Sequence, residues 1–317
     1  MNDNIIVVTI AGAVVAGTPL VLAALGEILT ERSGVMNLGI EGMMLLGAVF
    51  GIAATLATGD PYIGVVSGAI AGAALAFIHA ALVISLRVSQ IVSGLGLVIV
   101  GTGLSSYIGK LPASPLTDRA SVEGFHRLLP KSVADLPGIG PIVLGHDPIV
   151  YASWLLVAAC SFYLFRTRTG LAVRAVGEDP ATADAAGVRV GLVRYVHTVL
   201  GGALAGLGGA YLTIALTGIW QEGITAGYGW IAFAMVSFSA WRPWRALITG
   251  YVFGALTNLS FTLQLAGVAV PSDLLAALPF LLTIVTLIAI SARPASARGR
   301  AAPAALAVPY DRESRML

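Results

Sequence analysis

Long apolar runs, separated by short polar breaks, make up most of the chain. A helix of about 20 mostly apolar residues can cross the hydrocarbon core of a membrane, and it satisfies its own backbone polar groups there. The pattern therefore predicts an all-α polytopic membrane protein with about nine transmembrane helices. The segments with the required length and character are 5–29, 35–58, 62–86, 91–109, 148–165, 193–217, 224–240, 245–265 and 272–291.

The composition excludes a soluble domain. Of the 317 residues, 57% are hydrophobic and 11% are charged, whereas a typical soluble domain has about 25% charged residues. A soluble fold with so few charges would leave large apolar areas facing water. The single cysteine, Cys160, lies in an apolar run, so the chain cannot form an internal disulfide.

Basic residues are concentrated between two of the apolar runs. Five of the 18 Lys and Arg residues fall within 166–194. Loops rich in Lys and Arg remain on the cytoplasmic side of a membrane. We therefore expect this loop inside, the N-terminus outside and the C-terminus inside. Fourteen basic residues are then inside, against four in the outer loop 110–147: Lys110, Arg119, Arg127 and Lys131.

The polar stretches set the domain boundaries. Residues 1–292 are expected to form the transmembrane domain. The proline-rich outer loop 110–147 predicts either a partly ordered cap that faces an external partner or a plain linker. The tail 293–317 is rich in Ala, Pro and Arg, which predicts a disordered cytoplasmic tail.

Glycines recur four residues apart within the apolar runs. This spacing lets helix backbones approach closely in lipid, although glycine is also simply common in membrane helices. We favour close packing of helices at Gly47/Gly51, Gly64/Gly68/Gly72, Gly202/Gly206 and Gly250/Gly254.

Polar residues within the spans are candidates for a translocation path, because such residues usually face a bundle interior or a water-filled cavity. Glu41 is expected either to line that path or to pair with Arg32. His79 is expected to be a hydrogen-bonded interior histidine rather than a ligand. The path candidates are Ser33, Asn37, Glu41, Gln90, Ser93 and Asn258.

Two glycine-rich stretches predict interrupted helices. They read ERSGVMNLGIEG at 31–42 and GIWQEGITAGYGW at 218–230. Broken helices commonly line the cavities of transporters, since their freed backbone groups can bind a solute or an ion. Their comparable places in the two halves of the chain suggest an internal repeat.

A short helix is predicted inside the basic loop. Asp179 suits an N-cap and Pro180 the first helical position, while Gly187 suits the end of the helix. The sequence contains no GxxxxGK[ST] phosphate-binding loop. An active transporter of this kind would therefore take its energy from a partner or from an ion gradient.

Two motifs, ERSGVMNLGIEGMMLLGA at 31–48 and RAVGEDPATADAAGVRV at 174–190, carry a family resemblance. They resemble the permease subunits of bacterial ABC importers for branched-chain amino acids, ribose and nucleosides, and the likeness extends over residues 5–292. Within that group the chain is most similar to nucleoside permeases that pair with a second permease. Nine helices with an external N-terminus would match the ten-helix plan of the family without its first helix.

The resemblance implies a subunit of the bacterial inner membrane that forms half of the path for a small polar solute, foremost a nucleoside. Simple sugars or branched-chain amino acids are the alternative, and a stand-alone ion-coupled transporter is a more distant one. The implied partners are membrane lipid, an ATPase subunit that carries the ATP and Mg²⁺, a second permease forming a heterodimer, and a periplasmic or lipoprotein solute-binding protein. No cofactor is expected in this chain, and no nucleic acid.

The resemblance also assigns a role to the predicted short helix, which would be the coupling helix that docks on the ATPase. The alternative is an ordinary amphipathic connector. The matching positions are Gly177, Glu178, Asp179, Pro180, Ala181, Ala183, Ala186 and Gly187.

Overall fold

The computed structural model describes residues 2–111, 116, 121–134, 136, 140–265, 271–292 and 302–312. Helices alone make up the secondary structure of these residues, which confirms the predicted all-α class. The long helices are α1 (Asn2–Arg32), α2 (Ile40–Thr58), α3 (Pro61–Ala80), α4 (Gln90–Gly109), α6 (Pro148–Arg166), α9 (Val190–Tyr211), α10 (Tyr228–Phe238), α11 (Pro243–Leu265) and α12 (Ser272–Ser291).

Shorter elements complete the described chain. Two π-helical turns extend long helices: η1 (Ala81–Ser85) follows α3, and η3 (Leu212–Thr217) follows α9. The remaining short helices are α5 (Lys131–Ala134), η2 (Gly140–Leu144), α7 (Arg168–Glu178) and α8 (Pro180–Ala185).

Six helices in the described part of the chain are long and apolar enough to cross a membrane. They include α1, α2, α4 and α6, together with α3 and α9 when their π-helical turns are counted. Each of the nine predicted segments overlaps a helix, but α10 has only 11 residues where a span over 224–240 was expected. The chain is thus a multi-pass helical protein, and the count of nine spans and their sidedness stay predictions.

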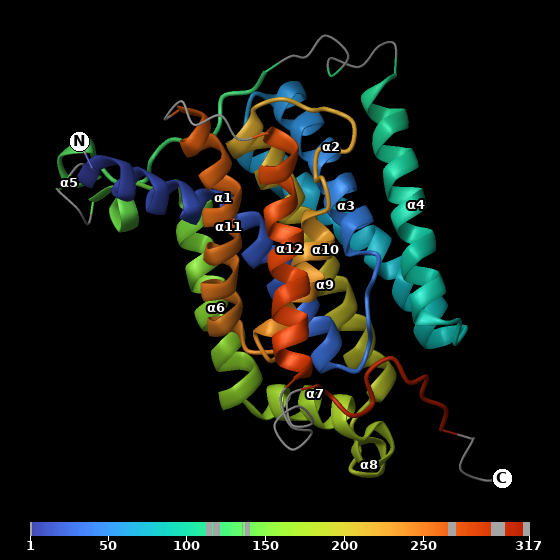
Figure 1. The fold of residues 1–317 in the computed structure, drawn as a ribbon. Helices are drawn as coiled ribbons and strands as arrows, with labels where there is room; N and C mark the ends of the chain where they lie inside the picture. The colour runs from blue at the N-terminus through green and yellow to red at the C-terminus, as the bar shows by residue number, and fades with distance from the viewer. Residues whose placement is uncertain are drawn as a thin grey trace.

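The long helices form one bundle (Figure 1). The short helices α7 and α8 lie together at one end of it, and we call this end the lever end and the opposite end the far end. Helix α1 packs against both α9 and α11, and α9 also packs against α2 and α3. Helix α4 stands at the edge of the bundle in Figure 1.

The regularly spaced glycines lie where helices cross. A Cβ atom on Gly47 or Gly72 would come closer than 3.0 Å to the backbone of Gly206 in α9. On the other side of the bundle, a Cβ on Gly254 would come equally close to the backbone of Ala13 and Gly17 in α1. Main chains therefore touch directly at these crossings, and the packing interpretation of the glycines is confirmed.

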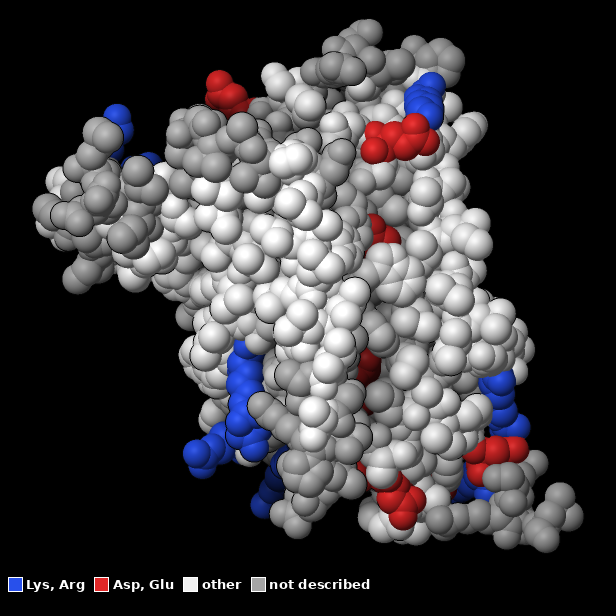
Figure 2. Space-filling model, in the orientation of Figure 1, with Lys and Arg blue, Asp and Glu red and all other residues white. Residues whose placement is uncertain are grey.

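Charged side chains gather at the two ends of the bundle and are sparse between them (Figure 2). At the far end, the described part of the outer loop is folded onto the helices. The Val122 amide donates to the Gly218 carbonyl at 2.8 Å, and the Phe125 ring stacks on Tyr211. Residues 121–134 are therefore ordered against the helices, while an external cap that faces a partner stays a prediction.

Part of the C-terminal tail is also folded. Residues 302–312 hydrogen-bond to the lever end, for example through the Ala305 amide to the Gly177 carbonyl at 2.8 Å. This differs from the disorder expected from composition over 293–317. Residues 293–301 and 313–317 lie outside the described residues.

Candidate functional site

The chain between α1 and α2 is not helical, as the first glycine-rich motif predicted. Three polar side chains hold this unwound segment, residues 33–39. Gln90 Oε1 accepts from the Met36 amide at 2.7 Å, and His79 Nε2 lies 3.0 Å from the Met36 carbonyl. Glu27 Oε1 accepts from the Asn37 amide at 3.0 Å. Groups that a helix would have satisfied internally are thus satisfied by neighbouring helices.

Asn37 and Ser93 belong to the same network. Asn37 Oδ1 accepts from the Gly39 amide at 3.0 Å, which closes a local turn before α2 begins. Ser93 Oγ lies 2.9 Å from His79 Nδ1. Both ring nitrogens of His79 therefore have partners, and its prediction as a hydrogen-bonded interior histidine is confirmed.

Glu41, in the first turn of α2 directly after the first interrupted segment, bonds to the end of the second one. Its Oε1 accepts from Thr225 Oγ1 at 2.6 Å and from the Gly227 amide at 3.0 Å. Its Oε2 accepts from the Gly229 amide at 2.6 Å. The carboxylate therefore caps the N-terminus of α10, where free amides and the helix dipole favour a negative charge. We call this set of contacts the Glu41 bridge.

The bridge lies well inside the bundle. The 11 residues of α10 span about 16 Å at 1.5 Å per residue, roughly half of a hydrocarbon core about 30 Å thick. The loop 218–227 leads to it from the far end, where Glu222 pairs with Lys110 at the end of α4. Helix α10 is therefore shorter than the span expected over 224–240, and whether this part of the chain crosses the membrane stays a prediction.

Glycines make the bridge possible. A Cβ on Gly229 would come closer than 3.0 Å to the Glu41 main chain. Gly227 has a φ of +88°, a conformation that residues with a side chain rarely adopt.

One of the two alternatives for Glu41 is wrong. Arg32 does not pair with it; Arg32 Nε instead donates to the Trp241 carbonyl at 3.4 Å. Whether Glu41 lines or gates a path belongs to the proposal below.

Ser33 and Asn258 lie apart from the other path candidates. Ser33 Oγ donates to the Thr30 carbonyl at 2.7 Å, at the C-terminal end of α1. Asn258, in α11, donates to the Thr9 carbonyl at 3.1 Å. It lines a separate cavity of about 490 Å³ together with Thr217 and Tyr228. The structure thus gathers Asn37, Gln90 and Ser93 around the unwound segment and places Glu41 in the bridge, while the hydrogen bonds of Ser33 and Asn258 go elsewhere.

The sequence analysis missed two buried carboxylates in α1. Glu27 holds the unwound segment, and Glu31 accepts a hydrogen bond from the Trp241 indole at the lever end of α10. Both side chains are buried. Their spacing of four residues on one helix face was the available signal, but their place at the end of an apolar run suggested a membrane surface.

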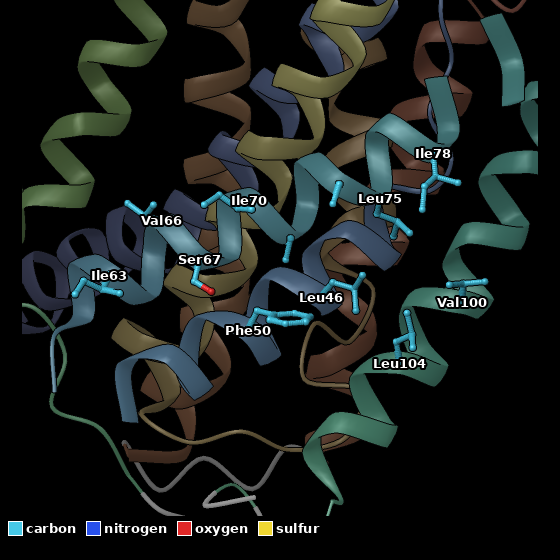
Figure 3. Close-up of a pocket in the computed structure, with 12 residues that line it drawn as sticks. Leu46, Phe50, Ile63, Val66, Ser67, Ile70, Leu75, Ile78, Val100 and Leu104 are labelled. Carbon is cyan, nitrogen blue, oxygen red and sulfur yellow. The ribbon is translucent and has the colours of Figure 1, made fainter. Parts of the chain in front are cut away.

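A larger cavity, of about 630 Å³, lies between α2, α3 and α4 (Figure 3). Its lining is aliphatic and aromatic, and Ser67 is the one polar residue among the 12 that line it. A polar solute would lose its hydrogen bonds to water there without replacement. This cavity suits hydrocarbon and is no candidate for a polar translocation path.

At the lever end, the predicted short helix is present as α8. Asp179 caps it by accepting from the Ala181 and Thr182 amides at 3.0 and 3.1 Å. Pro180 is its first residue, and Gly187, just after its end, has a φ of +86°. The local geometry predicted around Asp179, Pro180 and Gly187 is therefore confirmed.

The predicted coupling residues divide into two groups. Ala183 is buried against Val176 and Val190, and Gly177 is buried beside the tail. Ala181 and Pro180 are half-buried, and the exposed positions are Glu178, Asp179, Ala186 and Gly187.

A groove of about 500 Å³ runs between α7 and α8, and its lining includes Leu171, Ala175, Thr182 and Val188. Leu171 is 58% exposed, so the groove offers an apolar surface to a partner.

A family model describes this architecture. The model of the branched-chain amino acid transport system permease component matches residues 9–287. The chain belongs to this family of membrane permeases.

Curated relatives match over nearly their whole length. The chain is 39% identical to a putative glucose ABC transporter permease of Haloferax volcanii, over 94% of this chain and 95% of the relative. It is 32% identical to a guanosine ABC transporter permease of Bacillus subtilis, over 97% of each chain. It is 30% identical to a nucleoside ABC transporter permease of Lactococcus lactis, over 90% of this chain and 92% of the relative. No solved structure matches.

Proposed function

We propose that this permease subunit forms half of the translocation path of an ATP-driven importer, and that its solute is a nucleoside. Two of the relatives above are named for guanosine or nucleoside transport, and a third for glucose. The observation that carries the mechanism is the Glu41 bridge, which connects the first turn of α2 to the non-helical end of the loop 218–227 and the start of α10.

The bridge suits a gate. Hydrogen bonds between the Glu41 carboxylate and its donors on residues 225–229 can break and be replaced by bonds to water or solute, whereas interlocked backbones cannot separate without opening a void. In the proposed cycle, the ATPase moves α8 and the bridge opens and closes. ATP supplies the energy, and the permease changes its state because the states of the ATPase bind it with different affinity.

The chemistry of the interior favours a neutral solute. Glu41 is committed to three donors of the protein itself, and Glu27 and Glu31 also accept hydrogen bonds. A charged amino acid substrate would need a free counter-charge at depth. A nucleoside or a sugar would need only hydrogen bonds. We therefore favour a nucleoside or a sugar as the solute over a branched-chain amino acid.

The partners and the orientation follow from the lever end. An ATPase subunit would seat on α8 and the groove beside it, and it would carry the ATP and Mg²⁺. In this proposal the lever end lies in the cytoplasm, the N-terminus lies outside, and about nine spans cross the cytoplasmic membrane. A second permease would complete the path, and a solute-binding protein would deliver the nucleoside to the far end.

The test is uptake by the purified complex in proteoliposomes, with labelled guanosine, glucose and leucine offered in parallel. We expect ATP-dependent uptake of guanosine. Uptake of glucose alone would favour the sugar alternative, and uptake driven by an ion gradient without the ATPase would contradict the proposed energy source.

A further inference from the structure

The tail segment 302–312, which we call the strap, crosses the lever end and contacts several parts of the chain (red trace in Figure 1). The Ala305 amide donates to the Gly177 carbonyl in α7 at 2.8 Å, and the Ala307 amide donates to the Gly34 carbonyl at 3.2 Å. The Ala304 amide donates to Glu178 Oε2 at 3.3 Å. The strap thus touches both the last turn of α7 and the beginning of the unwound segment 33–39.

The seat of the strap is shaped by two glycines. A Cβ on Gly177 would lie 3.2 Å from Pro303 Cβ, and one on Gly34 would lie 3.4 Å from the Ala305 carbonyl oxygen. Pro303 and Ala305 are both buried. The closest neighbours of such Cβ atoms are the Arg32 carbonyl oxygen for Gly177 and Arg194 Nη2 for Gly34, so the strap packs against glycines that are already closely surrounded.

A buried arginine in α9 faces the strap. Arg194 is only 2% exposed, and its Nη1 donates to the Val308 carbonyl at 3.1 Å. Its Nε and Nη2 atoms have no hydrogen-bond partner among the described residues. Burying a guanidinium without hydrogen-bond partners costs free energy. The hydrogen bond to the Val308 carbonyl therefore offsets part of the cost of burying Arg194.

Two ion pairs fix the end of the strap. Arg312 Nε lies 2.9 Å from Asp184 Oδ2 in α8. Arg87, which follows η1, makes two hydrogen bonds with Asp311 at 2.6 and 2.9 Å. Exposed ion pairs contribute little to stability, and Arg312 is 80% exposed. These pairs matter for the position of the strap, because one connects it to α8 and the other connects it to the end of η1.

We infer that the strap is a second coupling element, which carries displacement of α7 and α8 to the unwound segment and so to the Glu41 bridge. This inference rests on the proposed function. The chain of contacts runs from Asp184 through the strap to the Gly34 carbonyl, and the same unwound segment ends one residue before the helix that bears Glu41. The strap residues act by positioning, and none of them needs to touch solute.

Truncation separates this role from general stability. One variant ends at Ala301 and removes the strap; its matched control ends at Arg312 and removes only the last five residues. In the reconstituted complex we expect both to assemble and to hydrolyse ATP at the basal rate. The chain that ends at Ala301 should lose about fivefold or more in guanosine taken up per ATP, the scale of a typical coupling free energy, while the control keeps the wild-type ratio.

Point variants serve if the shorter chain fails to fold. Arg312→Asp should lower the uptake per ATP, and the exchanged pair Asp184→Arg with Arg312→Asp should restore it. Ala307→Pro removes the amide that donates to Gly34 and should lower the ratio as well, while Ala307→Gly should not, because this residue has a φ of +64° that glycine adopts freely.

Two results would overturn the inference. One is an unchanged ratio in the chain that ends at Ala301. The other is a parallel loss of ATPase binding and uptake, which would make the strap part of the docking site only. A readout that needs no transport is hydrogen–deuterium exchange at the Met36 and Asn37 amides, which should become faster without the strap. Unchanged exchange contradicts the strap's role, whereas absence of ATP-dependent uptake in the wild type contradicts the proposed function instead.

Discussion

The bundle contains two kinds of junction between its helices. Where α2 and α3 meet α9, backbones touch at glycines such as Gly47, Gly72 and Gly206. Where α2 meets α10, a single carboxylate in the first turn of α2 holds residues 225–229 at the start of α10 through hydrogen bonds. The first kind tolerates almost no change of shape, and the second can exchange its partners for water or solute. Motion is therefore expected at the Glu41 bridge, and rigidity at the glycine crossings.

The largest effect is expected at a glycine crossing. Gly206→Leu would force a side chain into the backbone of α3, since even a Cβ there comes closer than 3.0 Å to the Gly68 carbonyl and to Gly72. Overpacking of this kind costs about 1–3 kcal/mol or more. We expect loss of the folded, monodisperse protein in detergent, measured by size-exclusion chromatography and by the melting temperature.

The matched control for that substitution is Gly96→Leu in α4, where a Cβ would meet nothing within 4 Å. We expect this variant to fold normally. An equal loss of folded protein in both variants would contradict the claim that the close helix crossings limit the fold more than other glycine positions do.

Glu41→Ala is expected to abolish uptake. It leaves the Thr225 hydroxyl and the Gly227 and Gly229 amides without their acceptor, at about 1–3 kcal/mol for each unsatisfied group. Glu41→Gln keeps an acceptor oxygen and should retain part of the activity. The measurements are guanosine uptake and thermal stability of both variants. Wild-type uptake by Glu41→Ala would contradict the role of Glu41 as part of the gate.

The double variant Asp179→Ala with Gly187→Trp tests the lever. Loss of the cap costs about 1 kcal/mol, and a Trp at the φ of +86° of Gly187 adds backbone strain of about 1–2 kcal/mol. Both costs are confined to α8 and its end and are too small to unfold the bundle. The new indole at an exposed position should block docking of the ATPase. We expect solute-stimulated ATP hydrolysis to be lost while the melting temperature stays near that of the wild type. Unchanged transport would contradict the docking role of α8.

The smallest effect is expected at the far end. Hydrogen bonds from Lys110 and Ser106 lower the pKa of the Glu222 carboxyl. A lowered pKa in the folded state means that the pair stabilises the protein above the unfolded pKa of about 4.3, and that this contribution is lost as the pH falls through the folded pKa. Glu222→Gln should therefore melt slightly below the wild type at neutral pH, and the two melting curves should converge in acid. A constant difference at all pH values would exclude titration of this pair as the cause.

Much of the helical layout could be predicted from the sequence, because hydrophobic runs report burial in lipid directly. The break at 33–39 and the cap of α8 were also predictable, since Gly, Asp and Pro act on the backbone locally. The bridge was not, because Glu41 and its partners are separated by 184 to 188 residues. The motif indicated that Glu41 was special without indicating what it bonds.

The folded position of the strap could not be predicted from its own sequence. An Ala-, Pro- and Arg-rich tail is typical of disorder, and nothing in its own composition predicts a binding seat. The seat is supplied by Gly34, Gly177 and Arg194, which are remote in sequence. Only the assembled lever end places these groups together.

Hydrogen–deuterium exchange at the Gly227 and Gly229 amides tests the central claim most directly. Both amides donate to Glu41 in the structure. The account predicts slow exchange in the resting complex and clearly faster exchange when the ATPase is trapped with ATP. Equal protection in the two states would mean that the bridge does not open, and the gate would have to be sought elsewhere.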